Sequence, residues 1–156
     1  MMKRGMRLFL AAALSGAFGA GVLTAAPAHA ADDWVNVSHL NGIPGHIVDK
    51  RQVAETYKGG AINVVIGWKK VDEVYVLSAV SDTAGDGYGL AVQIRYKALR
   101  SGGWSDWNYR LPAKAGGNGT VDRTMYRNIP AIAQVQARGC YYNSAGTLVN
   151  CDNTWH

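Results

Sequence analysis

The chain has 156 residues and a formal net charge of +5 at pH 7. Three of its 16 lysine and arginine residues lie within the first thirty positions, whereas all 11 acidic residues lie after them, so residues 31–156 carry a net charge of only +2. That small charge is spread along the chain, which argues against nucleic acid as a partner. No long apolar run follows residue 30, which argues against a membrane span in that part of the chain.

Residues 1–30 have the pattern of a secretory signal peptide. Three basic residues in the first seven positions precede an apolar run over 8–24 and the small-x-small sequence Ala28-His29-Ala30. This pattern, without a twin-arginine pair, predicts export by the general secretory route and cleavage after Ala30. Residues 31–156 are then expected to form a single secreted β domain, free of the membrane and without a cofactor.

The segment 49–57 fits two kinds of element. Asp49 could cap a short helix that carries Val53 and Tyr57 on one side. The spacing of Val53 and Tyr57 also fits a strand. We expect a short helix here.

Three strands are predicted in the middle of the chain. Residues 61–68 are rich in β-branched side chains, and residues 73–80 are apolar on both faces, which favours a central strand. Residues 90–98 alternate between apolar and polar side chains, which predicts a strand with one wet face. The Gly- and Asp-rich segment 81–89 predicts a hairpin between the last two strands.

Four further strands are predicted towards the C-terminus. Residues 108–111 and 121–127 flank a turn-rich connection over 112–119, and 131–142 and 147–151 form a last hairpin about a turn at 143–146. Short strands joined by Gly-rich turns predict an all-β fold, either an antiparallel β-sandwich or a small barrel.

The two cysteines lie on the two strands of this last hairpin. Cys140 and Cys151 are nearly symmetric about the turn, and an exported chain with two cysteines normally pairs them. We therefore expect a disulfide that clamps the hairpin, with a bulge in the turn as a source of a one-residue register shift. A loop of this size stabilises a fold by about 3 kcal/mol in the chain-entropy model.

The Ala-rich export signal, the loop at 82–87 and the Cys140–Cys151 hairpin together resemble the small secreted all-β proteins of Gram-positive soil bacteria, which are uncharacterised. The resemblance implies a small exported β-protein. It carries no activity and no site residue over to this chain.

Motifs of catalysis are missing from the sequence. There is no Gly-x-Ser-x-Gly elbow and no His-Glu-x-x-His. His39 and His46 lie in a Gly-, Pro- and Asn-rich segment, where most histidines are solvated, and His156 is the last residue, where order is usually poor. The sequence therefore predicts a protein that is not an enzyme.

One loop partly matches a calcium-binding pattern. Asp82 and Asp86 occupy the first and fifth positions of an EF-hand loop, with Gly87 at the sixth. The third and twelfth positions are Ala84 and Gln93, which supply no carboxylate. We therefore expect Asp82 and Asp86 to form a turn, and keep them only as weak metal candidates.

The densest aromatic cluster lies in the segment 102–110. Both phenylalanines belong to the predicted signal peptide, so every later aromatic side chain is Trp or Tyr, which suits half-wet surfaces. Sugar rings present C–H faces that stack on such side chains. The candidate ligand-binding residues are Trp104, Trp107 and Tyr109 for stacking, with Asp106, Asn108 and Arg110 for hydrogen bonds to hydroxyl groups. The competing interpretation assigns the same aromatics to the core.

These observations predict a secreted, non-catalytic binding protein whose ligand is an extracellular polysaccharide or a cell-envelope glycan. The alternative is a secreted protein-binding inhibitor or antagonist that inserts an exposed loop, such as 85–89, into a protein partner.

Overall fold

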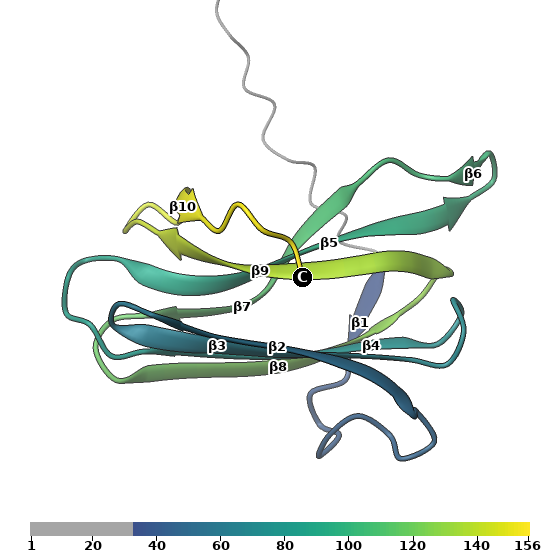
Figure 1. Ribbon diagram of the computed structural model, residues 1–156, viewed down its shortest axis with the longest axis horizontal. Coiled ribbons are helices and arrows are strands. Elements are labelled where there is room, and N and C mark those ends of the chain that lie inside the picture. Colours follow the sequence, from purple (N-terminus) through teal and green to yellow (C-terminus); the bar gives the residue numbers. More distant parts are fainter. Residues whose placement is uncertain (1–32) are drawn as a thin grey trace, which may run out of the picture.

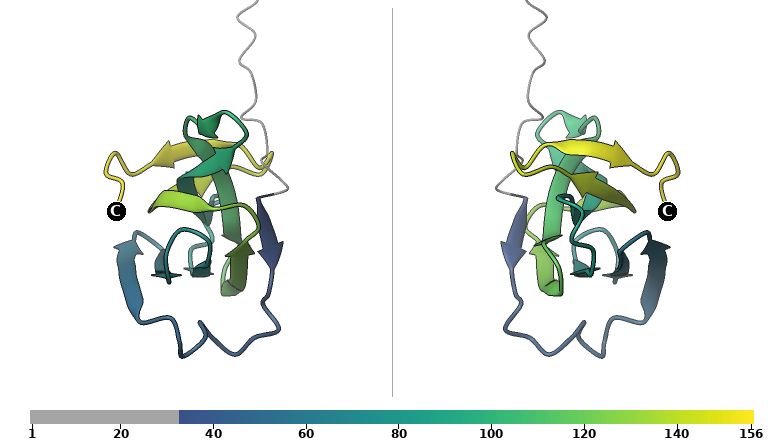
Figure 2. Two further views of the ribbon diagram at one scale, coloured as in Figure 1. Left: turned by 90° about the vertical axis from the view of Figure 1, so that its right-hand side faces the viewer. Right: turned by 90° about the vertical axis from the view of Figure 1, so that its left-hand side faces the viewer.

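The computed structural model describes residues 33–156. The predicted signal peptide and its cleavage site after Ala30 lie outside the described residues. Within 33–156 the chain forms ten β-strands and no helix. The strands form two antiparallel sheets that face each other, and one of the sheets curls into a half-barrel (Figures 1 and 2). The predicted all-β class is confirmed.

The strands of the first sheet lie in the order β1 (Trp34–Asn36), β8 (Thr120–Asn128), β4 (Val74–Asp82), β3 (Gly60–Trp68) and β2 (Asp49–Tyr57). The strands of the second sheet lie in the order β10 (Leu148–Cys151), β9 (Ile132–Tyr142), β5 (Gly89–Arg100) and β6 (Gly103–Trp104), and β7 (Asn108–Gly116) also pairs with β5. The tip of the β5–β6 hairpin projects from the body of the molecule (Figure 1).

The core lies between the two sheets. Even-numbered positions of β3, β4 and β5 point inward, because successive side chains of a strand alternate between its faces. The buried residues on these strands are Ile62, Val64, Ile66, Val74, Val76, Val80, Leu90, Val92, Ile94, Tyr96 and Ala98. The alternation predicted for 90–98 is therefore confirmed, and it leaves the odd positions of β5 on the outer face.

The outer face of the first sheet is partly covered. Ile47 packs there against Tyr75 and Met125, with Val37 and Ile43 beside them. The segment before β2 thus lies over this face, and the corresponding surface of the second sheet is the one that presents charged and aromatic side chains.

The first described residues are tied to the second sheet. Asp33 is only 4% exposed, and its carboxylate accepts two hydrogen bonds from the guanidinium of Arg100, both at 2.7 Å. It accepts a third from the hydroxyl of Tyr96 at 3.0 Å. Trp34 packs edge-to-face on the Tyr96 ring, with the centroids 5.3 Å apart. These contacts join the β1 edge of one sheet to β5 of the other.

The short helix expected at 49–57 is wrong, because this segment is strand β2. Each of its residues pairs with β3, from Asp49 opposite Trp68 to Tyr57 opposite Gly60. Val53 is buried and Glu55 and Tyr57 are half-buried, so the inward-facing side chains follow a period of two. The continuous ladder to β3 outweighs the local preference for a helical cap, because packing against neighbouring strands decides strand formation.

The hairpin predicted around 81–89 is also wrong, because β4 and β5 belong to different sheets. Both edges of β4 are occupied, by β3 and by β8. The loop after β4 therefore crosses to the second sheet. The buried carboxylate of Asp82 accepts hydrogen bonds from the backbone N–H of Ala84 at 3.0 Å and of Gly117 at 3.1 Å, and so joins this crossing to the one between β7 and β8.

The predicted connection at 112–119 is shorter than expected, because β7 continues through Pro112 to Gly116. Proline has no N–H to donate and is found in sheets at edges or bulges. The β5–β7 register is irregular between Val92 and Ile94, opposite positions 110–113, and β7 pairs only with β5. Pro112 therefore interrupts no regular ladder.

The predicted disulfide is confirmed. Cys140 and Cys151 are bonded, lie opposite each other on β9 and β10, and have Cα atoms 4.0 Å apart. The register of this pair shifts by one residue between Leu148 and Asn150, so the irregularity lies within β10 and not in the turn at 143–146, where it was expected.

Candidate binding face

The outer face of the second sheet gathers cations and aromatic rings from three strands. Arg95 and Lys97 occupy odd positions of β5, opposite to the core positions. Gln93 of β5 lies opposite Arg138 of β9, and Arg95 lies opposite Tyr109 of β7. Residues directly opposite on paired strands present their side chains on the same face. These five side chains therefore share one surface.

On this surface, cations alternate with tryptophan rings. The guanidinium carbon of Arg95 lies 4.3 Å from the ring centroid of Trp107 and 4.5 Å from that of Trp155. The guanidinium carbon of Arg138 lies 4.2 Å from the Trp155 centroid, and Nζ of Lys97 lies 5.4 Å from the Trp107 centroid. We call these five residues the Trp–Arg stack. Each such contact contributes about 0.5–1 kcal/mol at an exposed site.

The two arginines of the stack are held by amides. Nε of Arg95 donates to the side-chain oxygen of Gln136 at 2.8 Å, and Nε of Arg138 donates to that of Gln93 at 2.9 Å. Among the described residues, neither these arginines nor Lys97 takes part in a salt bridge. Burial lowers the pKa of Arg138 and Arg95 also lowers it, whereas Tyr109 and Asp152 act in the opposite direction. An arginine nevertheless remains charged. The stack therefore presents positive charge that no paired carboxylate neutralises.

The last residues of the chain bring Trp155 onto this face. The N–H of Asp152 donates to the carbonyl of Gly139 at 3.0 Å, and two backbone hydrogen bonds of 2.9 and 3.0 Å join His156 to Ala137. The ring of Trp155 lies 5.9 Å from that of Tyr109, centroid to centroid. The segment 152–156 is thus an ordered continuation of the pairing along β9.

The predicted aromatic residues occupy the same surface. Trp107 and Tyr109 are half-buried on it, and Trp107 is covered in part by Arg95 and Lys97. Trp104 lies opposite Leu99 near the tip of the β5–β6 hairpin, and these two side chains are 48% and 46% exposed. The three aromatics therefore share a face but do not form one flat row.

The predicted polar candidates are separated by the structure. Asp106 is exposed in the turn before β7, and its carbonyl accepts hydrogen bonds from Ser105 at 2.7 Å and from Asn108 at 3.1 Å. Arg110 lies on the other face of β7, with its guanidinium carbon 4.4 Å from the ring centroid of Tyr126. The arrangement brings Asp106 close to Trp107 and takes Arg110 away from it.

Sequence reasoning missed Arg95, Arg138 and Trp155. The sequence pattern placed Arg95 on the solvent-exposed face of a predicted strand and Arg138 within another, but it did not show which aromatic rings they contact. Trp155 was overlooked because it follows the last predicted strand. Its proximity to Cys151 was a usable signal, since a disulfide fixes the neighbouring chain against the partner strand.

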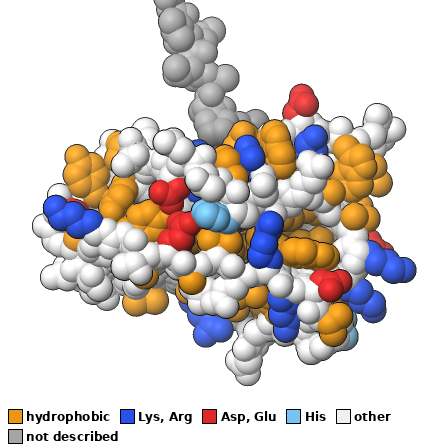
Figure 3. All heavy atoms as spheres, viewed as in Figure 1, with side chains coloured by type: hydrophobic (Ala, Val, Ile, Leu, Met, Phe, Trp, Pro, Cys, Tyr) orange, Lys and Arg blue, Asp and Glu red, His pale blue; other side chains and the backbone are white. Residues whose placement is uncertain are grey.

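A second polar cluster joins the two sheets at the β2 edge. The hydroxyl of Tyr57 is hydrogen-bonded to the carboxylates of both Glu55 and Asp152, and Nε2 of His156 lies 2.7 Å from Oε1 of Glu55. In Figure 3, a histidine touches acidic side chains near the middle of the visible face. Burial raises the pKa of Tyr57, and the two carboxylates raise it further. A phenol held neutral in this way is a poor nucleophile.

The carboxylates in the candidate calcium loop are occupied by backbone groups. Asp82 binds two backbone N–H groups, as described above, and Asp86 accepts a hydrogen bond from the N–H of Tyr88 at 3.0 Å. Across residues 33–156, no group of three or more His, Cys, Asp and Glu side chains is arranged to hold a metal ion. The contacts of Asp82 and Asp86 are those of turn residues.

In the part of the chain that the structure describes, no helix is long and apolar enough to cross a membrane. Comparisons of the chain with protein-family models, with curated proteins and with solved structures found no match.

Proposed function

We propose that this protein is a secreted, non-catalytic binding protein that recognises acidic glycans of the cell envelope or the extracellular medium. The observation that supports this function best is the Trp–Arg stack on the outer face of the second sheet. Tryptophan rings suit the C–H faces of sugars. Guanidinium groups suit carboxylate or phosphate groups on the same polymer, because their planar N–H donors match those oxygens.

The cations are the reason for preferring an acidic glycan to a neutral one. A neutral sugar requires a bare ring face, whereas Arg95 and Lys97 already cover part of Trp107. Both arginines bind amides, so their charge remains available to a ligand. Secretion is supported by the disulfide, which is typical of oxidising compartments, and by the signal-peptide pattern of residues 1–30.

The direct test measures retention of the oxidised protein, residues 31–156, on insoluble acidic and neutral polymers. Cross-linked polygalacturonate and bacterial walls that carry teichoic acid are compared with chitin and cellulose. We expect retention on the acidic polymers, weakened by added salt because exposed charges are screened. Retention on the neutral polymers alone would refute the acidic preference, and retention on none of them would refute glycan binding.

The same assay with folded variants tests the site. Trp107→Ala, Trp155→Ala and Arg95→Gln each remove two cation–ring contacts of the stack. We expect a loss of about 1–2 kcal/mol, or roughly 5- to 30-fold in affinity. Arg127→Gln is the matched control, because Arg127 is exposed on β8 in the other sheet. Equal affinity of the stack variants and the control would place binding elsewhere.

One observation favours the alternative, a protein-binding inhibitor or antagonist. Leu99 and Trp104 form an exposed apolar pair on the projecting β5–β6 hairpin. Exposed apolar side chains that lie together often mark protein contacts, and Trp is enriched among the residues that dominate them. The double variant Leu99→Ser with Trp104→Ser distinguishes the two functions. Unchanged retention on acidic polymers, together with loss of binding to a protein captured by the unaltered chain, would favour a protein partner.

A further inference from the structure

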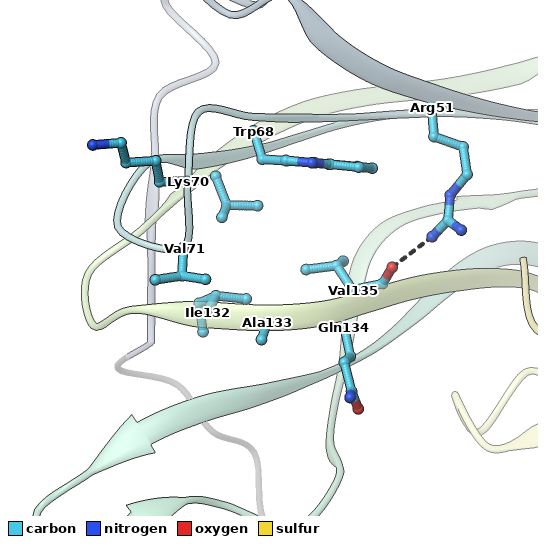
Figure 4. A pocket seen from close by; sticks show the side chains of 9 residues that line it. Arg51, Trp68, Lys70, Val71, Ile132, Ala133, Gln134 and Val135 are labelled. Atoms are coloured by element: carbon cyan, nitrogen blue, oxygen red, sulfur yellow. Dashed lines mark hydrogen bonds between the residues drawn. The ribbon is translucent and has the colours of Figure 1, made fainter.

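A cavity separate from the Trp–Arg stack opens at one end of the sandwich, between the two sheets (Figure 4). Its volume is about 390 Å³, and most of the surface around it is apolar. Trp68 and Val74 line it from the first sheet, and Ile132 and Val135 line it from β9. Val71 lies beside Ile132 (Figure 4). Ile132 and Val74 also belong to the buried core, so the cavity is an open extension of the core.

Strand β9 is irregular beside this cavity. The pairing of β9 with β5 shifts between Arg95 and Lys97, so β9 contains an extra residue there. Gln134 lies in this bulge, has a positive φ of 54°, and points away from the cavity (Figure 4). A bulge bends its strand, and strained non-glycine residues at positive φ cluster at functional sites, ligand-binding positions among them.

The charged side chains around the cavity are both cationic. Arg51 lies on the inward face of β2, two residues before the buried Val53, and its guanidinium carbon is 6.0 Å from the ring centroid of Trp68. Its Nη2 donates to the carbonyl of Val135 at 2.7 Å, which leaves further N–H donors of the five in a guanidinium. Lys70 lies at the rim, and no acidic residue lines the cavity. Among the described residues, neither cation forms a salt bridge.

We propose that this cavity binds a small amphipathic organic anion. Its apolar body lies between Trp68 and Ile132, and its carboxylate accepts hydrogen bonds from Arg51. The volume falls in the range of small-molecule sites, about 300–1,000 Å³, and apolar walls with one convergent charged group are typical of such sites. The occupant is small because the cavity is bounded by both sheets. This site does not depend on the glycan-binding function.

The test uses three probes with the same chain and different head groups: octanoate, octanol and octyltrimethylammonium, all below their micellar concentrations. Binding is followed by amide NMR shifts and by calorimetry on the disulfide-bonded protein. We expect saturable shifts for octanoate at Val71, Ile132 and Val135, at least tenfold weaker binding of octanol, and no binding of the cation. Equal binding of all three probes, or no saturable binding of octanoate, would overturn the proposal.

Two variants and a control locate the head group and the chain. Arg51→Gln is expected to weaken octanoate binding at least tenfold while leaving octanol binding unchanged. Lys50→Gln is the matched control, because Lys50 is the neighbouring cation on the opposite face of β2. Val71→Phe fills the cavity from an exposed position and is expected to abolish binding of every probe. Full octanoate affinity in either Arg51→Gln or Val71→Phe, with the fold intact by NMR, would contradict the assignment.

Discussion

Gly139 of β9 lies directly beneath the phenol of Tyr57, across the gap between the sheets. A Cβ atom at position 139 would overlap both the hydroxyl oxygen and the ring of Tyr57. The same hydroxyl is bonded to Glu55 and Asp152. Because glycine has no Cβ, the Tyr57 ring fits against β9, and its hydroxyl can bond both Glu55 of β2 and Asp152 of the C-terminal segment.

Gly139→Ala should lower the free energy of unfolding by about 1–3 kcal/mol, the usual range for overpacking. The stiff ring of Tyr57 has to move and loses its two carboxylate partners. Denaturant unfolding measures the change. In a Tyr57→Ala background the same substitution should cost little, as a double-mutant cycle would show. An equal loss in both backgrounds would mean that Gly139 is required by the conformation of β9 and not by the Tyr57 ring.

The buried hydroxyl of Tyr96 makes the free energy of unfolding depend on pH. Burial raises its pKa above the ordinary value of 10.0, and the buried carboxylate of Asp33 raises it further. The folded state therefore holds the proton more tightly than the unfolded state does. The stabilising contribution is complete below about pH 10, the unfolded value, and is lost as the pH rises above it.

We accordingly expect the free energy of unfolding to fall between pH 9.5 and pH 11, and to fall less steeply in Tyr96→Phe. The variant should also lose about 1 kcal/mol at neutral pH, because Asp33 loses a hydrogen bond. Urea unfolding at a series of pH values measures both effects. Tyr88→Phe, at an exposed position, is the control, and an unchanged alkaline slope in Tyr96→Phe would contradict the prediction.

At the level of elements, the segment after β10 is supported by the disulfide and by hydrogen bonds to β9. Cys151 is fixed to Cys140, and the next residues follow β9 through the hydrogen bonds of Asp152 and His156. This path carries Trp155 to its place between Arg95 and Arg138. The covalent bond thus supports a side chain four positions away.

Replacing both cysteines by alanine should lower the free energy of unfolding by about 3 kcal/mol, the chain-entropy value for a short loop. It should also weaken binding to acidic polymers, since the segment that carries Trp155 loses its covalent support. Trp155→Ala with the disulfide intact should lose the same binding and keep most of the stability. Thermal unfolding and polymer retention measure the two effects, and unchanged retention in the cysteine-free protein would show that the segment is held by hydrogen bonds alone.

The strands whose sequence pattern is strong were predicted well. The alternation of 90–98 identifies β5 and its core face, and the symmetric placement of Cys140 and Cys151 identifies the last hairpin. The pairing of β4 was not predictable in this way. Its two apolar faces indicate a central strand, but which strands occupy its edges depends on β8, about forty positions later.

The candidate site was predicted only in part, for a similar reason. Trp104, Trp107 and Tyr109 are close in sequence, so their clustering was visible. The partners of Trp107 come from β5, and Trp155 comes from the end of the chain. Contacts between residues far apart in sequence depend on sheet order, which local periodicity does not contain.

Viewed as a whole molecule, the two sheets are joined by polar contacts at both open edges. At the β1 edge, Asp33 binds Arg100 of β5. At the β2 edge, Glu55 and Tyr57 bind the C-terminal segment through His156 and Asp152. These polar contacts favour one relative position of the two sheets, because hydrogen bonds and ion pairs require a specific geometry. Apolar packing is non-directional and specifies that position less strictly.

Arg100→Gln removes the bidentate partner of a buried carboxylate. We expect a loss of about 1–3 kcal/mol in the free energy of unfolding, because Asp33 is left with the Tyr96 hydroxyl alone. The double variant with Asp33→Asn should recover part of the loss, since the buried group is then neutral. Arg123→Gln, at an exposed site on β8, is the control, and a loss no larger than that of the control would show that solvent replaces the Arg100 contact.

The place of Trp155 gives the disulfide a consequence beyond stability. A chain whose two thiols are still reduced has no covalent hold on the residues that complete the outer face. Under the proposed function, oxidation should therefore act as a maturation step, because it adds a covalent support to the segment that carries Trp155. If the protein is exported and binds acidic polymers as proposed, its affinity for them should rise when the disulfide forms.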